Sequence, residues 1–223
     1  KLPARAHLTA MEARAKRRKR PSRRAVKAQN GSNAMRGAEP NRALTVYTIG
    51  HSTRALAEFT RLLREHGINR VADVRTIPRS RRNPQFNRET LPAALVEAGI
   101  GYAHLPELGG RRRPRPDSPN AGWRNASFRG FADYMQTPAF AEGLQRLMEM
   151  TGDNGLVIMC AEAVPWRCHR SLIADALTLR GVRVRHLIGT ATVRPHMPHI
   201  LTPWARVDGT TLIYPPTAVA PDH

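Results

Sequence analysis

Short apolar runs alternate with helical patterns along the chain from Leu44 onward. The apolar, often β-branched runs cover residues 45–49, 70–75, 101–105, 156–160 and 182–188. Between them, apolar residues recur every three or four positions, which is the spacing of one buried helix face. Strands that alternate with helices are typical of a parallel sheet. The sequence therefore predicts an α/β fold: a single three-layer domain with a mostly parallel sheet of about five strands and helices on both faces.

The ends of these elements carry turn and cap residues. A glycine follows three of the helical patterns directly, at Gly67, Gly99 and Gly181. This is the position at which glycine commonly ends a helix. Ser52 or Thr53 is the expected cap of the first helix, because a side-chain oxygen there can accept from the first-turn amides. Residues 106–129 show no clear period, and we expect an irregular loop there.

Three parts are expected along the chain, whose 223 residues suffice for one domain with tails. Residues 44–190 hold the alternating pattern and form the α/β domain. Residues 191–223 are punctuated by proline and are expected to pack on this domain or to trail from it. Within them, residues 212–214 could add a short edge strand. Residues 1–43 are expected to be a disordered basic tail.

Positive charge is concentrated in that tail. The chain has a net charge of +19, and residues 1–43 contribute 13 Lys/Arg against two acids, or +11. The basic run of residues 16–24 attracts polyanions whatever the folded domain does. Residues 32–35 read Ser-Asn-Ala-Met, the form left by tag cleavage ahead of a starting methionine. Part of the sequence before them is therefore expected not to be native.

Two classes of protein are not indicated. No apolar run reaches the roughly 18 to 20 residues that a membrane-spanning helix needs, so we expect no membrane partner. The basic N-terminal region is followed by no apolar stretch typical of a secretory signal, and the chain has only two cysteines. We therefore expect a cytoplasmic protein without disulfides.

Polar residues gather where the predicted strands end. Ligands of open α/β sheets bind beyond the carboxyl ends of the strands, and parallel strands bring these ends to one edge. The segments expected there are residues 50–53, Asp73 with residues 75–83, residues 107–110 and residues 160–170. The pattern predicts one cleft that these four segments share.

Each cysteine is a candidate nucleophile. Cys168 is expected in the first turn of a helix beside Arg167, His169 and Arg170, where the helix dipole and positive neighbours favour its thiolate. Cys160 ends a strand, as the reactive cysteine of thiol phosphatases and rhodaneses does. Their arginine follows six positions later, however, whereas Arg167 is seven positions away. Either cysteine could instead be a small buried residue without chemistry.

Other side chains of the cleft could move protons. His169 or His51 is the expected acid or base, although a lone histidine at a strand end is often structural. Glu162 could be a general acid or base, or it could hold Arg75 or Arg170 in a salt bridge, which we favour slightly.

A metal site is a further interpretation of the same segment. Its potential zinc or iron ligands would be Cys160, Glu162, Cys168 and His169, with His51 and Asp73 outside them. Paired CxxC knuckles are absent from the sequence. We therefore expect no metal and no cofactor.

The loop of residues 79–87 combines arginines, amides and Phe86. Arginine offers two donors at once to phosphate or carboxylate, and the aromatic ring offers a stacking face. We favour an anionic ligand over a solvated basic loop. The expected ligand-binding residues are Ser52, Asp73, Arg75, Arg79, Arg82, Asn87, His104, Glu107 and Arg170.

Several of these segments carry a resemblance to one family. They are residues 48–52, 73–75, 78–80, 86–87, 102–110, 160–162 and 168–170. In this order they resemble the motifs of the DUF488 family, a domain of unknown function, over about residues 44–190. The resemblance implies a bacterial or archaeal intracellular α/β domain. It implies no reaction, although some members carry a DNA-repair label.

Three functions remain open. The leading hypothesis is a domain that binds an anionic, phosphate-bearing ligand and acts through a thiol. The second is a nucleic-acid-binding accessory domain whose arginines grip phosphates, and the third is a metal-dependent hydrolase. The expected partner is an anionic small molecule or a nucleic acid.

Overall fold

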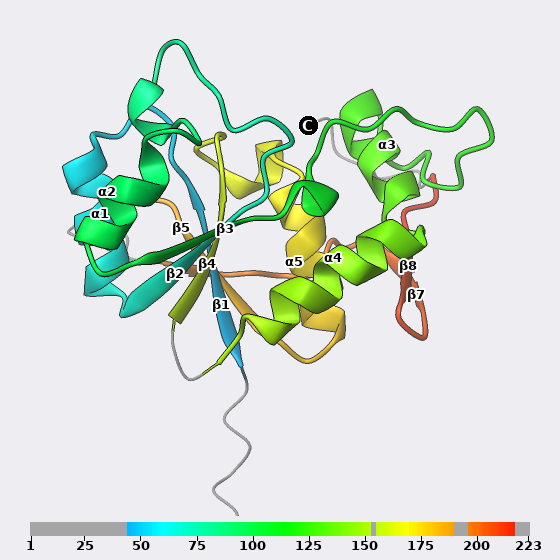
Figure 1. Cartoon of the computed structure of the whole chain (residues 1–223). Helices are drawn as coiled ribbons and strands as arrows, with labels where there is room; N and C mark the ends of the chain where they lie inside the picture. Colours follow the sequence, from blue (N-terminus) through cyan, green and yellow to red (C-terminus); the bar gives the residue numbers. More distant parts are fainter. Residues whose placement is uncertain (1–43, 153–154, 190–195, 217–223) are drawn as a thin grey trace, which may run out of the picture. The chain divides into compact units, whose positions relative to one another are not determined.

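A six-stranded sheet forms the centre of the fold. The computed structural model describes residues 44–152, 155–189 and 196–216, so the expected basic tail lies outside the described residues. The strands are β1 (Thr45–Gly50), β2 (Ile68–Asp73), β3 (Gly101–His104), β4 (Gly155–Cys160), β5 (Arg183–Leu187) and β6 (Met197–Pro198). Their order is β3-β2-β4-β1-β5-β6, and β6 alone pairs antiparallel (Figure 1). The predicted α/β class is confirmed.

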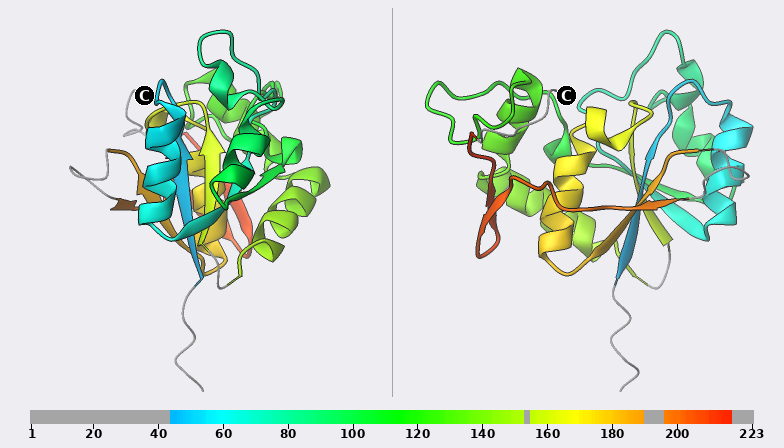
Figure 2. Two further views of the ribbon diagram at one scale, coloured as in Figure 1. Left: turned by 60° about the vertical axis from the view of Figure 1, so that its left-hand side comes forward. Right: turned by 180° about the vertical axis from the view of Figure 1, so that it is seen from behind.

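The described residues form five α-helices. They are α1 (Leu56–Glu65), α2 (Leu91–Glu97), α3 (Ala126–Tyr134), α4 (Pro138–Glu149) and α5 (Arg170–Leu179). Figure 1 shows α1 and α2 on one side of the sheet and α4 and α5 on the other, and both views of Figure 2 agree. No helix in the described ranges is long and apolar enough to cross a membrane.

Strand β4 belongs to the cores on both faces. Val157 and Met159 pack with the apolar sides of α1 and α2. Leu156, Ile158 and Cys160 pack with α4 and α5. Because successive side chains of a strand point to opposite faces, a strand covered on both sides must be apolar throughout. This packing on both faces holds β4 in place. Cys160 therefore has a fixed position at the carboxyl end of the strand, where the site lies.

Helix α3 begins at Ala126, inside the stretch of residues 106–129 that was expected to be an irregular loop. The expectation was therefore wrong for residues 126–129. The side-chain oxygen of Asn125 accepts from the amides of Ser127 (2.9 Å) and Phe128 (3.4 Å), which caps the helix start. Phe128 and Phe131 are buried on one face of the helix. The cap residue and the short apolar stripe that follows it are the sequence signals that could have predicted this helix.

The start of α1 also differs from the expectation. Its cap position is Ala55, and no side chain caps it, so neither Ser52 nor Thr53 has the predicted role. Ser52 instead has a φ of +48°, an unusual left-handed turn for a residue with a side chain. Its amide donates to the carbonyl of Ala161 at 2.9 Å, which joins the loop after β1 to the loop after β4.

The described C-terminal residues pack on α5. Asp175, which is fully buried, accepts from His199 Nε2 at 2.8 Å and from the Tyr214 hydroxyl at 2.9 Å. Residues 212–214 were expected to add a short edge strand or to pack as a tail. They do not join the main sheet: β8 (Thr211–Ile213) pairs with β7 (Arg206–Asp208) in a separate hairpin, and the edges of the main sheet are β3 and β6.

Candidate functional site

A cleft of about 670 Å³ lies beyond the carboxyl ends of the parallel strands. Loops that follow β1, β2, β3 and β4 supply its walls, as expected when parallel strands end at one edge. The predicted site residues that line it are His51, Ser52, Arg75, Arg79, Arg82, Cys160, Glu162, Cys168 and His169. The fold thus brings together side chains that lie up to 118 positions apart in the sequence.

Two glycines allow these loops to approach closely. A Cβ added to Gly50 would lie 1.7 Å from the carbonyl oxygen of Glu162, so the chain after β1 touches the backbone after β4. A Cβ on Gly110 would lie 2.3 Å from Nδ1 of His169. Any larger residue at either position must displace the opposite loop, so both glycines hold the cleft in shape.

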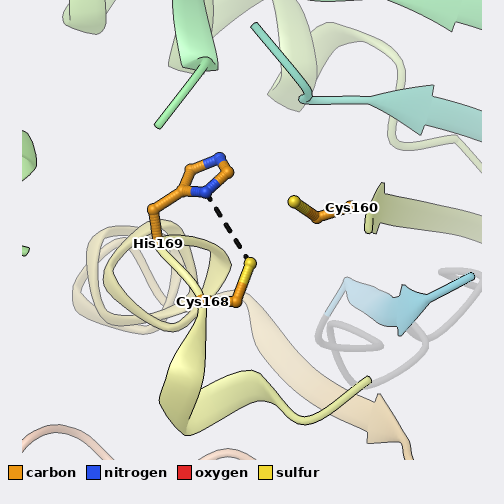
Figure 3. Close-up of side chains that lie close together, drawn as sticks. All are labelled: Cys160, Cys168 and His169. Atoms are coloured by element: carbon orange, nitrogen blue, oxygen red, sulfur yellow. Dashed lines mark hydrogen bonds between the residues drawn. The ribbon is translucent and has the colours of Figure 1, made fainter. Parts of the chain in front are cut away.

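Cys168 and His169 form a thiol–imidazole pair (Figure 3). The Cys168 Sγ lies 3.7 Å from Nδ1 of His169, and Nε2 of the same ring lies 3.2 Å from the carbonyl oxygen of Val74. A carbonyl can only accept, so Nε2 carries a proton, and Nδ1 is the ring nitrogen that faces the thiol. A base that is oriented by a third group is the usual arrangement around an activated nucleophile.

The position of Cys168 differs from the prediction by a few residues. Helix α5 begins at Arg170 with His169 as its cap, so Cys168 precedes the helix rather than lying in its first turn. The helix dipole therefore acts on the thiol less directly than was expected. The hydrogen bond from Cys160 and the nearby imidazole favour the thiolate instead.

The two thiols have opposite tendencies to ionise. Burial opposes ionisation of Cys168, but the hydrogen bond from Cys160 and the adjacent His169 outweigh it and lower its pKa well below the usual range. The hydrogen bond to Cys168, together with burial, raises the pKa of Cys160 well above the usual range. Of the two thiols, Cys168 is therefore the one that loses its proton first.

The same atoms could hold a metal ion. The sulfurs of Cys160 and Cys168 and a ring nitrogen of His169 all lie within 4.8 Å of one another. Two thiolates and an imidazole suit a soft or borderline ion such as zinc, with a fourth position left for a ligand. Glu162, His51 and Asp73, which were considered as further ligands, are not in this group.

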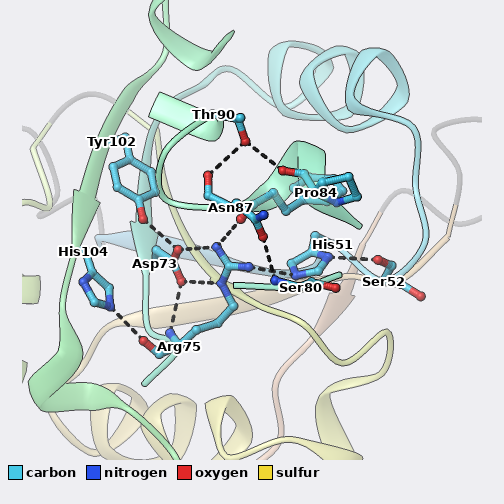
Figure 4. Close-up of polar contacts among 11 residues, drawn as sticks. His51, Ser52, Asp73, Arg75, Ser80, Pro84, Asn87, Thr90, Tyr102 and His104 are labelled. Atoms are coloured by element: carbon cyan, nitrogen blue, oxygen red, sulfur yellow. Dashed lines mark hydrogen bonds and ion pairs between the residues drawn. The ribbon is translucent and has the colours of Figure 1, made fainter. Parts of the chain in front are cut away.

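Asp73 and Arg75 form a buried ion pair beneath the cleft (Figure 4). Asp73 is 0% exposed, and Arg75 is 6% exposed. One carboxylate oxygen accepts from the amide and Nε of Arg75, and the other accepts from its Nη2 at 2.6 Å and from the Tyr102 hydroxyl at 2.8 Å. Asp73 is thus committed to Arg75 and does not line the cleft.

His51 is held by both of its ring nitrogens. Nε2 accepts from Nη1 of Arg75 at 3.1 Å, and Nδ1 donates to the carbonyl of Ser52 at 2.9 Å. The ring stacks on Phe86 with centroids 4.3 Å apart. Burial lowers the pKa of His51 to about 4. This histidine is therefore neutral and fully engaged near pH 7, which speaks against its predicted part in proton transfer.

Arg75 keeps one donor for the cleft. A guanidinium has five N–H groups. Those of Arg75 donate twice to Asp73, once to His51 and once to the carbonyl of Phe86 at 2.7 Å. This leaves one N–H of Nη1, on a side chain that lines the cleft. Its position is fixed, whereas an exposed arginine must be ordered when a ligand binds.

Exposed arginines surround the cleft opening. Arg79 and Arg82 come from the loop after β2, Arg111 from the loop after β3, and Arg167 from the loop after β4. Among the described residues that line the cleft, Glu162 is the single carboxylate, and it is exposed. An excess of positive charge in a concave site attracts anions.

Two of these arginines were absent from the predicted ligand set. Arg111 lies in a run of three arginines in the stretch expected to be an irregular loop, and Arg167 was considered only as a neighbour of the thiols. Ser127 and Phe128 also line the cleft and were missed, because the start of α3 was expected to be irregular loop.

Five predicted ligand residues do not line the cleft: Asp73, described above, Arg170, and three others. The side-chain oxygen of Asn87 accepts from the Ser80 amide at 2.6 Å, and Nε2 of His104 lies 2.8 Å from the carbonyl oxygen of Arg75. Both contacts shape the loop after β2. Glu107 instead forms an ion pair with Arg146 at 2.6 Å.

Arg170 is also structural. It is 1% exposed and donates to the carbonyls of Glu162 (2.6 Å) and Ala163 (2.9 Å). The slightly favoured salt bridge from Glu162 to Arg75 or Arg170 was wrong: Arg170 donates to the main-chain carbonyl of Glu162, and Arg75 pairs with Asp73. A buried guanidinium holds the loop after β4 in place beside the thiols.

Comparison with known proteins identifies a family. A family model described as a domain of unknown function, DUF488, matches residues 55–177. Neither the curated proteins nor the solved structures gave a match to this chain. The matched residues make up more than half of the chain and include both cysteines, His169 and the loop after β2. The chain belongs to the DUF488 family.

Proposed function

We propose that this domain is a thiol-dependent enzyme that acts on a substrate with an anionic group, with phosphate as the best-fitting group. Cys168 is the nucleophile, and His169 is the base that takes its proton. The observation that carries the proposal is the thiol–imidazole pair, with 3.7 Å between Sγ and Nδ1, on the wall of an arginine-rich cleft.

Each step has a group available for it. The carbonyl of Val74 fixes the His169 ring, so that Nδ1 faces the thiol and can hold its proton. Arg79, Arg82 and the remaining N–H of Arg75 supply charged donors for phosphate oxygens. A substrate anchored in this way would present its electrophilic atom to the Cys168 sulfur. Binding of the anionic group would thus orient the substrate for the reaction.

Protection of Cys168 from a neutral alkylating reagent tests this proposal. We expect iodoacetamide to modify Cys168, and inorganic phosphate or pyrophosphate to slow the modification more than sodium chloride of equal ionic strength. The double variant Arg79→Gln/Arg82→Gln should lose most of this protection. The control is Arg183→Gln, which changes an exposed arginine at the start of β5, the end of the strand away from the cleft. This variant should keep the protection. Unreactive thiols, or equal protection by chloride, would contradict the proposal.

Nucleic-acid binding is the second candidate. It is favoured by exposed arginines on the loops around the cleft, among them Arg81 and Arg113, which suit a phosphate backbone. The test is DNA and RNA binding at increasing salt by the full chain and by a variant with every Lys and Arg of residues 16–24 changed to Gln. Steep salt-dependent binding that survives this change supports the domain as the binding surface, and its loss assigns the binding to residues 16–24.

A metal-dependent hydrolase is the third candidate, and the spacing of the two sulfurs and the His169 ring nitrogen favours it. Elemental analysis of protein prepared without chelator tests it. One zinc or iron per chain that is lost in Cys168→Ser would replace the thiol mechanism with metal catalysis, because a bound metal occupies the lone pairs that the thiol reaction needs. Protein without stoichiometric metal and with a reactive Cys168 supports the thiol mechanism.

A further inference from the structure

The second thiol, Cys160, has no part in the reaction proposed above. It is a free cysteine, 7% exposed, at the end of β4, and it lines the cleft. Its sulfur lies within 4.8 Å of both the Cys168 sulfur and a ring nitrogen of His169. Figure 3 shows it pointing toward this pair. Two free thiols that face each other beside a base form a unit that can react in two steps.

We infer that Cys160 is the resolving thiol of Cys168, and that the domain exchanges with disulfides of anionic low-molecular-weight thiols. The inference rests on the proposed function, because it needs Cys168 as the attacking group and the arginines as the anion holder. It adds the reaction type, a second reacting residue and the class of substrate.

The reaction balances without a further reagent. The Cys168 thiolate attacks one sulfur of a disulfide RSSR, which forms a mixed disulfide and releases one thiolate, RS⁻. The Cys160 thiol gives up its proton and attacks the Cys168 sulfur, and the second RS⁻ leaves and is protonated. The protein dithiol has then become a Cys160–Cys168 disulfide while RSSR has been reduced to two thiols. Two molecules of another small thiol can return the protein to its dithiol form by the reverse exchange, and they leave as a disulfide.

Closure of the disulfide requires the two sulfurs to approach each other through side-chain rotation. A disulfide bond is about 2.05 Å long, so the two sulfurs must approach by less than about 3 Å from their present separation. The backbone is held on both sides. The carbonyl of Cys160 accepts from the His51 amide at 2.9 Å, and the Cys168 amide donates to Pro165 at 2.9 Å. The χ1 angles of the cysteines are therefore the available freedom.

The charge of the cleft selects among disulfides. Arg79, Arg82, Arg111 and Arg167 stand around the two thiols, and Glu162 is the single acid among the described lining residues. A disulfide with carboxylates or phosphates is drawn toward this site, and a cationic one is repelled. The thiolate itself repels anions, so the arginines are the feature on which the preference depends.

Four disulfide probes of different charge test the inference on the full, reduced chain. They are oxidised glutathione, which carries carboxylates, coenzyme A disulfide, which carries phosphates, the neutral hydroxyethyl disulfide and the cationic cystamine. Mass spectrometry of peptides follows the products. We expect an intramolecular Cys160–Cys168 disulfide, formed at least about tenfold faster with an anionic probe than with cystamine at low salt. The faster of the two anionic probes identifies the preferred group.

Single substitutions separate the roles of the thiols. Cys160→Ser should stop at a mixed disulfide on Cys168, and Cys168→Ser should leave Cys160 unmodified over the same period. A mixed disulfide that persists on Cys168 of the unmodified chain, beside a free Cys160, would overturn the inference but leave the proposed function standing. Equal rates with all four probes would overturn the substrate class. Thiols inert to every disulfide and to iodoacetamide would overturn both proposals.

Discussion

The central residue of this account is His169, whose two ring nitrogens have different tasks. Nε2 is held by the carbonyl of Val74, so the remaining nitrogen faces the Cys168 sulfur at 3.7 Å. In this arrangement the ring can hold the proton of the thiol and stabilise its thiolate. By contrast, both nitrogens of His51 have fixed partners within the protein.

His169→Gln should therefore slow the alkylation of Cys168 by iodoacetamide at pH 6 by on the order of tenfold or more. Without the imidazole the pKa of Cys168 rises, since burial then has less to oppose it. The measurement is the rate of modification between pH 5 and 9 in both proteins. The control is His66→Gln, which changes a histidine outside the cleft lining. A pH profile that His169→Gln leaves unchanged would remove this residue from the mechanism.

The ion pair of Asp73 and Arg75 belongs to the same scale. Asp73→Asn should lower the free energy of unfolding by about 3–5 kcal/mol, because it leaves a buried guanidinium without its countercharge. Asp117→Asn removes an exposed partner of Arg115 and should cost about 1 kcal/mol or less. Urea unfolding of both variants checks this. A similar decrease in the free energy of unfolding in both variants would show that the buried ion pair contributes no more to stability than the exposed one.

At the scale of elements, loops rather than helices build the cleft, and their close packing is the critical feature. The loop after β3 reaches the His169 ring because residue 110 has no side chain. The loop after β4 is held by Arg170 through two carbonyls. The carbonyl of Val74, which follows β2, holds the same His169 ring. The thiol pair therefore depends on contacts made by the connections after β2, β3 and β4.

Gly110→Ala tests this dependence. Its new methyl group would meet the His169 ring at 2.3–2.9 Å, so the ring must move and the alkylation of Cys168 at pH 6 should fall severalfold. Gly152→Ala is the matched control, because nothing lies within 4 Å of the added atom. Thermal unfolding separates a local shift from loss of the fold. Unchanged reactivity in Gly110→Ala would show that the ring position does not control the thiol.

The elements of the sheet could be predicted because their signals are local. The buried run of β4 and the glycines after α1, α2 and α5 gave the α/β class. Cleft residues such as Arg79 and Cys168 followed from the rule that parallel strands end at one edge. The direction of a side chain was not predictable. Arg170 points into the core and Glu162 out to solvent, although both lie in the segment with the strongest chemical signal.

For the whole molecule, two buried neutral histidines link stability to pH. Burial lowers the pKa of His51 to about 4 and that of His186 to about 3. His186 lies between Thr48 and His199, with contacts of 2.7 and 2.9 Å that leave both ring nitrogens engaged. Both histidines titrate near pH 6.5 once the chain unfolds, so the unfolded state binds more protons below that pH.

The free energy of unfolding should therefore fall as the pH is lowered from about 6.5 to about 4. The loss from His51 alone is on the order of 3 kcal/mol at the acid end. Urea unfolding at half-unit pH intervals measures it, and His186→Gln should show a shallower slope. A stability that rises on acidification in this range would contradict the assigned neutral states.

The claim that a reactive thiol and an anion cleft form one site can be tested in a single comparison. Iodoacetate and iodoacetamide alkylate the same sulfur, but iodoacetate carries a carboxylate that the surrounding arginines attract. At low salt and pH 6, we predict that Cys168 reacts faster with iodoacetate than with iodoacetamide, and that 0.5 M sodium chloride removes the difference, on the order of tenfold. Faster reaction with iodoacetamide at every salt concentration, or modification of neither cysteine, would contradict the account.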